Sequence, residues 1–162
     1  MNSYFPIFLN MKDRQVQVFG GGNIALRRIK ALLEFGAKVS AAAPEMNEDL
    51  QKLAVQQGNL QLEYRTYCPG ELGKAEIVLA VTDDTVVNTM IFEECRQKHI
   101  WVNVASNKEQ CDFFFPGIAS QGEITIGVTA GGKNHQKAAK VTEKIRRQLL
   151  EWENGNDHLE DG

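Results

Sequence analysis

The residues with the clearest chemical potential are three consecutive glycines at positions 20–22. Gly20, Gly22 and Ala25 match the dinucleotide-binding pattern G-x-G-x-x-A, in which the first glycine permits a tight turn and the second lets the backbone approach a pyrophosphate. The N–H groups at the start of the following helix then favour an anion. The pattern alone is weak, because a glycine-rich turn can also merely connect two elements, so the surrounding elements decide its meaning.

Those surrounding elements have the required order. Residues 15–19 (QVQVF) predict a strand that runs directly into the glycines, and from Ala25 onward apolar side chains recur with helical spacing. Gly36 stands where the glycine that ends a helix is expected, and residues 39–43 predict a second strand, stopped by Pro44. The handedness rule makes these two strands parallel neighbours. We therefore predict that the glycine turn binds a nicotinamide dinucleotide.

The rest of the chain continues this alternation. Strands are predicted over residues 60–64, 77–81 and 101–105, helices over 47–57 and 85–99, and a turn over 68–70. Alternating strands and helices predict an α/β fold with a Rossmann-type doubly wound parallel sheet. Beyond Asp112 a strand is predicted over 123–128 and a basic helix from about residue 137 to 152. The predicted organisation is a dinucleotide-binding domain in residues 1–112, a small strand-plus-helix region in 113–152, and an acidic, disordered tail in 153–162.

Composition excludes several classes of function. The chain has 162 residues and a formal net charge of −3, which gives no electrostatic basis for binding nucleic acid or an anionic membrane. No apolar run approaches the roughly 20 residues that span a bilayer, and no export signal is recognisable. The three cysteines (Cys68, Cys95 and Cys111) form neither a CxxC metal pair nor a disulfide framework. We expect a cytoplasmic protein without a metal site.

The ends of two predicted strands bear on the choice of cofactor. The second strand ends in Ala43 without the usual ribose-binding acid, and Glu45 follows Pro44. No Arg or Lys stands there to attract a 2′-phosphate, which favours NAD over NADP. At the end of the fourth strand, Asp84 is expected to cap the next helix. Asp83 either contacts ribose or substrate or has a plain turn role.

Five segments together resemble one family. FPIFLNMKDRQVQVFGGGNIALRR, AVTDD, WVNVASN, CDFFFPG and ITIGVTAGGK are similar, in this order and over roughly residues 4–150, to the precorrin-2 dehydrogenase and sirohydrochlorin ferrochelatase family, the N-terminal module of siroheme synthase. The resemblance implies NAD-dependent oxidation of precorrin-2 to sirohydrochlorin in siroheme biosynthesis. It also implies that residues 113–152 form a dimerisation and substrate region of a homodimer, in a short, stand-alone form of the module.

The resemblance also assigns site residues. It places cofactor contacts at the glycine turn and at two strand ends, namely Gly20, Gly22, Asn23, Ile24, Thr82, Asp83, Asn103 and Val104. Because precorrin-2 is a polycarboxylate, we expect Lys133, beside Gly131 and Gly132, to touch the substrate. The other basic residues, from 137 to 147, are interpreted as the solvated face of an amphipathic helix.

The catalytic base is the main departure from the family pattern. The family commonly has a carboxylate just after its N-V pair, whereas this chain has Ser106 and Asn107, which cannot accept a proton at neutral pH. The remaining candidates are Asp112, for which a structural role is favoured, and His135, which is a base, a metal ligand or a surface residue. Two other functions stay open: a sirohydrochlorin chelatase or tetrapyrrole carrier with weak dehydrogenase activity, and a non-catalytic dinucleotide-sensing module.

Overall fold

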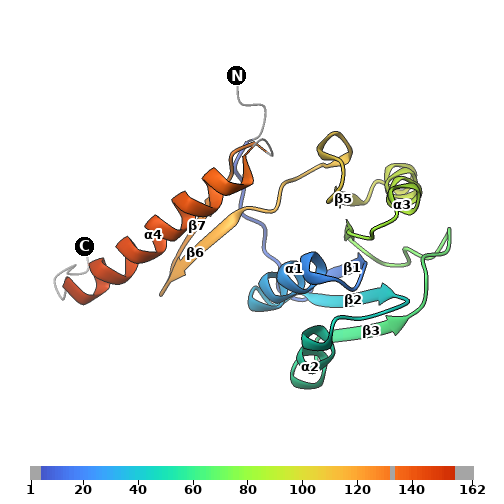
Figure 1. The fold of residues 1–162 in the computed structure, drawn as a ribbon, viewed down its shortest axis with the longest axis horizontal. Coiled ribbons are helices and arrows are strands. Elements are labelled where there is room, and N and C mark those ends of the chain that lie inside the picture. The colour runs from blue at the N-terminus through green and yellow to red at the C-terminus, as the bar shows by residue number, and fades with distance from the viewer. Residues whose placement is uncertain (1–4, 132–133, 156–162) are drawn as a thin grey trace. The chain divides into compact units, whose positions relative to one another are not determined.

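The computed structural model describes residues 5–131 and 134–155, and these form two compact units (Figure 1). The larger unit runs from Phe8 to Phe113. The smaller unit combines the chain up to Ile7 with the chain from Phe114 onward. Each unit has its own sheet.

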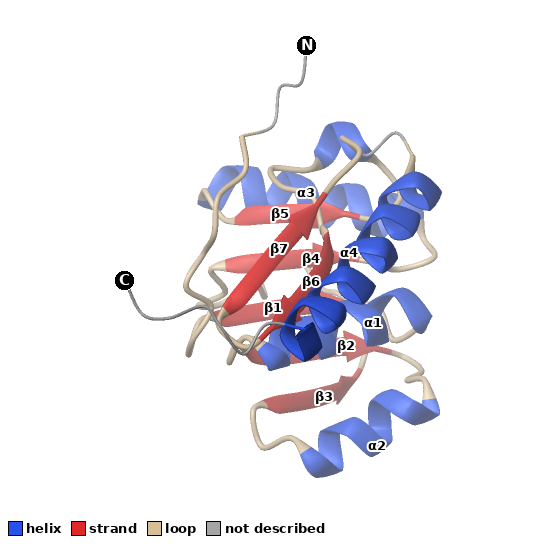
Figure 2. Cartoon of the chain, turned by 90° about the vertical axis from the view of Figure 1, so that its left-hand side faces the viewer, coloured by secondary structure: helices blue, strands red, loops and turns tan. Residues whose placement is uncertain are grey.

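The larger unit is built on a five-stranded parallel sheet in the order β3-β2-β1-β4-β5 (Figure 2). Its strands are β1 (Gln15–Phe19), β2 (Lys38–Ala43), β3 (Leu60–Tyr64), β4 (Ile77–Ala80) and β5 (Trp101–Val104). The chain moves outward from β1 to β3 and then returns to β4 on the other side of β1. This reversal creates the switch point at which such sheets bind ligands, beyond the carboxyl ends of the strands. The predicted doubly wound parallel sheet is confirmed.

Three helices accompany the sheet: α1 (Asn23–Glu34), α2 (Glu48–Gln56) and α3 (Thr85–Lys98). Helix α1 buries Ala25, Ile29 and Leu32, the predicted apolar stripe. It ends as predicted, because Gly36 has a φ of 79° and its N–H donates to the carbonyl of Leu33. Asp84 accepts hydrogen bonds from two N–H groups in the first turn of α3, which confirms its capping role.

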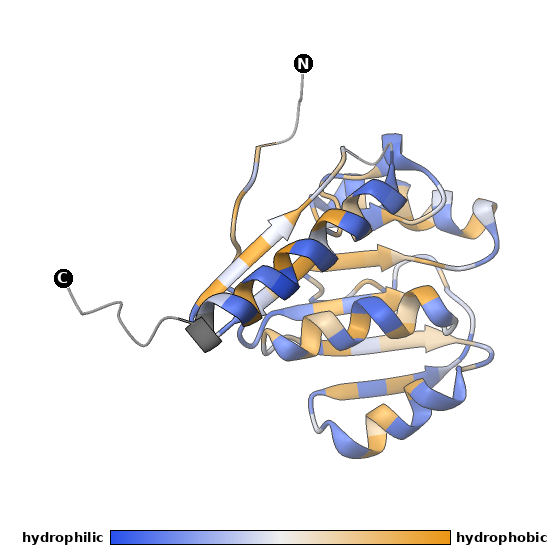
Figure 3. Cartoon of the chain, turned by 60° about the vertical axis from the view of Figure 1, so that its left-hand side comes forward, coloured by the Kyte–Doolittle hydropathy of each residue, from blue (hydrophilic) through white to orange (hydrophobic). Residues whose placement is uncertain are grey.

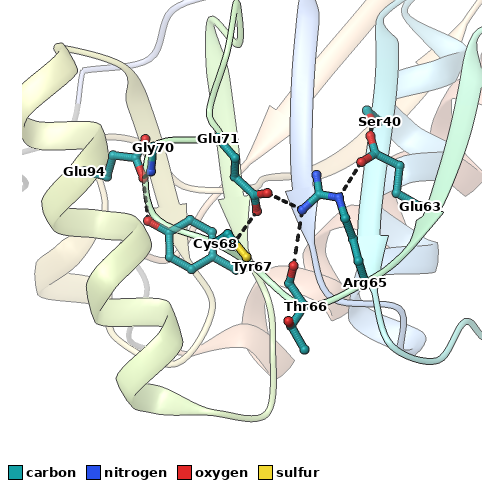
Figure 4. Close-up of polar contacts among 9 residues, drawn as sticks. All are labelled: Ser40, Glu63, Arg65, Thr66, Tyr67, Cys68, Gly70, Glu71 and Glu94. Atoms are coloured by element: carbon teal, nitrogen blue, oxygen red, sulfur yellow. Dashed lines mark hydrogen bonds and ion pairs between the residues drawn. The ribbon is translucent and has the colours of Figure 1, made fainter.

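The connection from β3 to β4, residues 65–76, contains no helix and is held by side chains instead (Figure 4). The Leu72 side chain is buried in the core, and the Tyr67 ring meets the Phe19 ring edge-on at a centroid distance of 5.1 Å. Arg65 forms ion pairs with Glu63 and Glu71. These contacts fold the connection onto the sheet where a crossover helix would otherwise lie.

A carboxylate on α3 anchors the same connection. Glu94 accepts hydrogen bonds from the Tyr67 hydroxyl at 2.5 Å and the Gly70 N–H at 2.9 Å (Figure 4). It also pairs with Lys98 at 2.7 Å. Burial alone would raise the pKa of Glu94, but the contacts with Lys98, Tyr67 and Gly70 outweigh it and lower the pKa to about 2. The charged form of this carboxylate is therefore the one that the fold requires.

The smaller unit is an antiparallel hairpin, β6 (Gly117–Gln121) and β7 (Ile124–Val128), together with α4 (His135–Gly155). Sequence analysis predicted β7 and the helix but missed β6, because GIASQ combines glycine and small polar residues that give little strand signal. Thr142 of α4 is buried against Gly117, and the Arg146 guanidinium donates to the carbonyl of Ile118. Among the described residues, no helix is long and apolar enough to cross a membrane.

The Glu94 anchor predicts a pH-dependent stability. Glu94→Gln should lower the free energy of unfolding at pH 7 by about 1–3 kcal/mol, because a charge-assisted set of hydrogen bonds is lost at a buried position. Since the folded pKa lies below the unfolded value of about 4.3, the contribution of Glu94 is present above that pH and is lost as the pH falls toward 2. Urea unfolding of both proteins between pH 7 and pH 3 measures this.

The exposed neighbour Glu93 supplies the control. Glu93→Gln should leave both the stability and its pH dependence close to those of the original chain. An equal loss in both variants would show that general charge on α3, rather than the anchor, sets the stability.

Candidate functional site

The glycine turn is defined by close backbone packing on two sides. Gly20 has a φ of 127°, and a Cβ there would collide with the carbonyl of Val81, just after β4. A Cβ on Gly21 would collide with the carbonyl of Glu45, just after β2. Both positions therefore require glycine. Sequence analysis treated Gly21 as a free position of the motif, and the structure shows that packing fixes it as well.

Gly22 differs from its two neighbours, because a Cβ there would meet nothing within 4 Å. It is the N-cap of α1, with no side chain capping the helix and no acidic residue in the first turn. The first backbone N–H groups of α1 have no partners within the helix, and at this end of the helix there is neither a capping side chain nor an acidic residue. This open, uncapped helix start fits the pyrophosphate of a dinucleotide.

Asn23 and Ile24 begin α1 at the edge of this opening. The Asn23 carboxamide accepts a hydrogen bond from the Asn47 side chain at 2.8 Å, and the Asn47 N–H donates to the carbonyl of Gly21 at 2.8 Å. Asn47 also caps α2. The start of α2 is thus fastened to the glycine turn, while the Ile24 side chain is 46% exposed beside it.

At the end of β4, one buried side chain organises the neighbouring turns. Asn88 of α3 is fully buried and accepts hydrogen bonds from the Thr82 N–H and hydroxyl, at 3.1 Å and 2.8 Å. It donates to the Thr82 carbonyl at 2.9 Å and to the Ser106 hydroxyl at 3.2 Å. Asn88 therefore links the ends of β4 and β5. Asp83 is exposed there, and no hydrogen bond or ion pair holds its side chain within the described part of the chain.

Sequence analysis missed Asn88, although a signal exists. Asn88, Ile91 and Cys95 recur with the spacing of one helix face, and all three are buried. An asparagine on an apolar face must satisfy its polar atoms inside the protein. This requirement indicates, from the sequence alone, that Asn88 makes hydrogen bonds inside the protein.

Asn103 and Val104, predicted as cofactor contacts, are buried in β5. The Asn103 carboxamide accepts from Arg28 of α1 at 2.6 Å and donates to the carbonyl of Phe113 at 2.6 Å. Burial lowers the pKa of Arg28 to about 10. The Cys111 thiol is hydrogen-bonded to the backbone of Val104: its sulfur lies 3.3 Å from the Val104 nitrogen and 3.2 Å from the Val104 carbonyl oxygen. Both residues thus already have protein partners.

The candidate bases lie in different environments. Ser106 is exposed and is held by Asn88, while the Asn107 carboxamide oxygen accepts from the Glu109 N–H and caps a short 3₁₀ turn, Lys108–Gln110. Asp112 accepts from the Val102 N–H at 3.0 Å and from Arg96 at 3.3 Å. Through the Val102 contact, Asp112 is tied to the backbone of β5.

The remaining predicted residues belong to the smaller unit. His135 is the exposed first residue of α4, and Gly131 has a φ of 62°. Gly132 and Lys133, predicted as substrate contacts, lie outside the described residues. No group of three or more His, Cys, Asp or Glu side chains that could hold a metal ion occurs among the residues described.

Burial raises the pKa of Cys95 to about 12 and also raises that of Cys111, so neither thiol is a ready nucleophile.

The open start of α1 predicts that Gly22 serves binding rather than folding. Gly22→Val should change the free energy of unfolding by about 1 kcal/mol or less, because a Cβ at position 22 meets no heavy atom within 4 Å. It should weaken binding of a nicotinamide dinucleotide by about tenfold or more, because the side chain occupies the approach of the pyrophosphate. Isothermal titration and thermal unfolding measure the two effects.

Gly58→Val is the matched control, because Gly58 is also exposed and a Cβ there also meets nothing within 4 Å. Its dinucleotide affinity should equal that of the original chain. Unchanged affinity in Gly22→Val would contradict this assignment of the site.

Comparison with known proteins gives consistent results. A family model described as NAD(P)-binding matches residues 7–117. Siroheme synthase from Actinobacillus pleuropneumoniae serotype 3 (strain JL03) is 34% identical over 92% of this chain and 29% of its own length. Siroheme synthase from Nitrosococcus oceani is 32% identical over 91% of this chain and 30% of its own length. The chain thus spans about three tenths of the length of these relatives.

A solved structure resembles most of this chain. SirC, precorrin-2 dehydrogenase, matches with a TM-score of 0.72 and 25% sequence identity, covering 95% of this chain and 72% of its own. The resemblance inferred from the motifs is confirmed by these matches. The chain belongs to the NAD(P)-binding family whose model covers its glycine turn and all five strands of its parallel sheet.

Proposed function

We propose that this chain catalyses the NAD-dependent oxidation of precorrin-2 to sirohydrochlorin in siroheme biosynthesis. The observation that carries the proposal is the open, uncapped start of α1 at Gly22, in a chain that is similar over 95% of its length to SirC, precorrin-2 dehydrogenase. The siroheme synthase relatives support the same pathway.

Each part of the carboxyl edge has a role in this proposal. Gly20, Gly22 and the first N–H groups of α1, at Asn23 and Ile24, hold the pyrophosphate. The turn at Thr82, which Asn88 keeps in place, presents Asp83 toward the ribose or the substrate. When bound, NAD⁺ supplies the hydride acceptor of the reaction. Thus the chain itself mainly binds and orients the two reactants.

The charges near the end of β2 support NAD rather than NADP. Glu45 is exposed two residues beyond β2, where a carboxylate would repel a 2′-phosphate. Arg65 follows β3, and its N–H donates to the carbonyl of Ala43 at the end of β2. Its guanidinium is already paired with Glu63 and Glu71 (Figure 4), so it is not available to a phosphate.

The proton lost from the substrate has no evident carboxylate acceptor among the predicted bases. Asp112 accepts hydrogen bonds from the chain, and Ser106 and Asn107 cannot hold a proton at neutral pH. We infer that the proton passes to water in this chain. A positioned general base typically contributes ~10²–10⁴-fold to a rate, so its loss slows such a reaction without abolishing it.

The proposal includes a cytoplasmic homodimer. The support for the homodimer is the apolar segment at the beginning of the described chain, where Phe5 is 84% and Phe8 is 75% exposed. Exposed apolar groups of this size mark surfaces that associate. The alternative function is a sirohydrochlorin chelatase or tetrapyrrole carrier. A carrier needs no proton acceptor, so the missing carboxylate at Ser106 and Asn107 favours the carrier within this second candidate.

The direct test is anaerobic incubation of the purified chain with precorrin-2 and either NAD⁺ or NADP⁺. We expect NADH and sirohydrochlorin to form together and in equal amounts, with NAD⁺ preferred. Absorbance spectra follow both products. Tetrapyrrole binding without turnover would reject the dehydrogenase and move the chelatase or carrier to first place.

Restoring a carboxylate tests the inference about the proton. Asn107→Asp should raise kcat, by at most the ~10²–10⁴-fold that a general base supplies, and it keeps the oxygen that caps the Lys108–Gln110 turn. Gln97→Glu adds the same charge on the exposed side of α3 and should leave kcat unchanged. An unchanged kcat in Asn107→Asp would mean that another group already accepts the proton.

A further inference from the structure

Asn47, the residue just before α2, connects two helix starts at the carboxyl edge of the parallel sheet. Its backbone N–H donates to the carbonyl of Gly21 at 2.8 Å. Its carboxamide oxygen accepts from the Asp49 N–H at 2.8 Å and so caps α2. Its carboxamide nitrogen donates to the carboxamide oxygen of Asn23, the first residue of α1, at 2.8 Å. The start of α2 is therefore tied to the start of α1 through one side chain.

The partners of Asn47 determine which way both carboxamides are turned. A backbone N–H can only donate, so the atom of Asn47 that meets Asp49 must be the oxygen. The carboxamide nitrogen of Asn47 then faces Asn23 and can itself only donate, so Asn23 must present its oxygen. The nitrogen of the Asn23 carboxamide makes no hydrogen bond within the described part of the chain. Asn23 is thus held with its acceptor occupied and its donor available.

This available donor lies beside the open start of α1. Asn23 is exposed and directly follows Gly22, the uncapped N-cap of the helix. The phosphate oxygens of a dinucleotide accept hydrogen bonds and do not donate them. A carboxamide that turned its oxygen toward the phosphates would repel them, and one without a partner would have to be ordered when the cofactor binds. The contact with Asn47 avoids both penalties.

The position of Asn47 itself is determined by contacts with the glycine turn. Of the nine residues of α2, only Leu50 is buried, and Figure 3 shows hydrophilic residues over much of this helix, the lowest in that view. The chain just before α2 packs more closely, because Met46 is 7% exposed and its sulfur lies 3.0 Å from where a Cβ of Gly21 would be. The Gln51 side chain also donates to the carbonyl of Met46 at 2.9 Å. Asn47 is therefore held at a set position relative to the glycine turn.

We propose that Asn47 is a positioning residue for the dinucleotide. It holds the Asn23 carboxamide so that the nitrogen of Asn23 donates a hydrogen bond to the pyrophosphate. The inference rests on the proposed function for the presence of the cofactor, and it adds a residue that touches neither the cofactor nor the substrate. The N-cap of α2 then has a second task, because it orders a ligand contact on the neighbouring helix.

The experiment measures the affinity of the chain for NADH by fluorescence titration. In Asn47→Ser the helix keeps a capping side chain, because serine and asparagine cap helices about equally well, but no nitrogen is left to donate to Asn23. The affinity for NADH should fall about three- to tenfold, the effect of having to order one side chain on binding. Circular dichroism and thermal unfolding should match those of the original chain.

A double-mutant cycle tests whether Asn47 acts through Asn23. Asn23→Ala should weaken NADH binding about tenfold or more, because a hydrogen bond to a charged oxygen is lost. Adding Asn47→Ser to this variant should weaken binding no further. Losses that add in the double variant would overturn the proposal, because Asn47 would then support the site by another route. Unchanged affinity in Asn47→Ser alone would overturn it as well.

Asn59→Ser is the matched control within the same unit. The carboxamide nitrogen of Asn59, which precedes β3, donates to the carbonyl of Ala37, which precedes β2, at 2.8 Å. The substitution removes a contact of the same length at the amino end of the sheet, away from the glycine turn. Its affinity for NADH should equal that of the original chain. Equal weakening in Asn59→Ser and Asn47→Ser would reject the assignment in favour of a general loosening of the sheet.

Turnover separates this inference from the proposed function. Asn47→Ser should raise the KM for NAD⁺ and leave kcat unchanged, because the pyrophosphate takes no part in the chemical step. If Asn47→Ser oxidises precorrin-2 with an unchanged KM for NAD⁺, the positioning role is rejected and the dehydrogenase stands. If NADH binding depends on Asn47 but precorrin-2 is never oxidised, the dehydrogenase is rejected and the positioning role stands. No NADH binding by the original chain would overturn both.

Discussion

The close approach of two backbone segments to the β1–α1 turn is the constraint on which the site depends. The carbonyl of Val81 occupies the space of a Cβ on Gly20, and the carbonyl of Glu45 occupies that of a Cβ on Gly21. Because the turn is packed from the ends of both β4 and β2, it cannot move outward. The start of α1 is thus fixed at the switch point of the sheet, with its N–H groups uncovered.

A second constraint follows from the return of the chain from β3 to β4. That connection must cross the sheet, and it contains no helix to bury an apolar stripe of its own. Leu72 and Tyr67 supply the apolar contact, and Glu94 and Arg65 hold the polar backbone around them. Charged groups therefore perform a task that helix packing performs in the other connections. The cost is a dependence on the ionised state of Glu94.

Local patterns predicted most of this fold but few of its long-range polar contacts. The bounds of β1 and β3 and the glycine that ends α1 match the prediction, because each depends on neighbours in sequence. β6 escaped detection since its partner strand, rather than its own residues, stabilises it. The pairing of Glu94 with Tyr67 depends on a distance of 27 positions that no periodicity encodes. The requirement for glycine at position 21 likewise arises only from Glu45.

The predicted site residues differ in whether their hydrogen-bonding atoms are already used by the protein, and this difference decides which of them can bind a ligand. Asn103 and Asp112 have the right chemistry for binding and catalysis, but the protein already uses both atoms of the Asn103 carboxamide and both oxygens of Asp112. A ligand that took them over would have to break contacts that hold β5. Asp83 and the start of α1 carry no such obligation among the described residues. Binding energy is available only from groups whose capacity the fold leaves open, which is why these positions, rather than Asn103 and Asp112, define the surfaces open to a ligand.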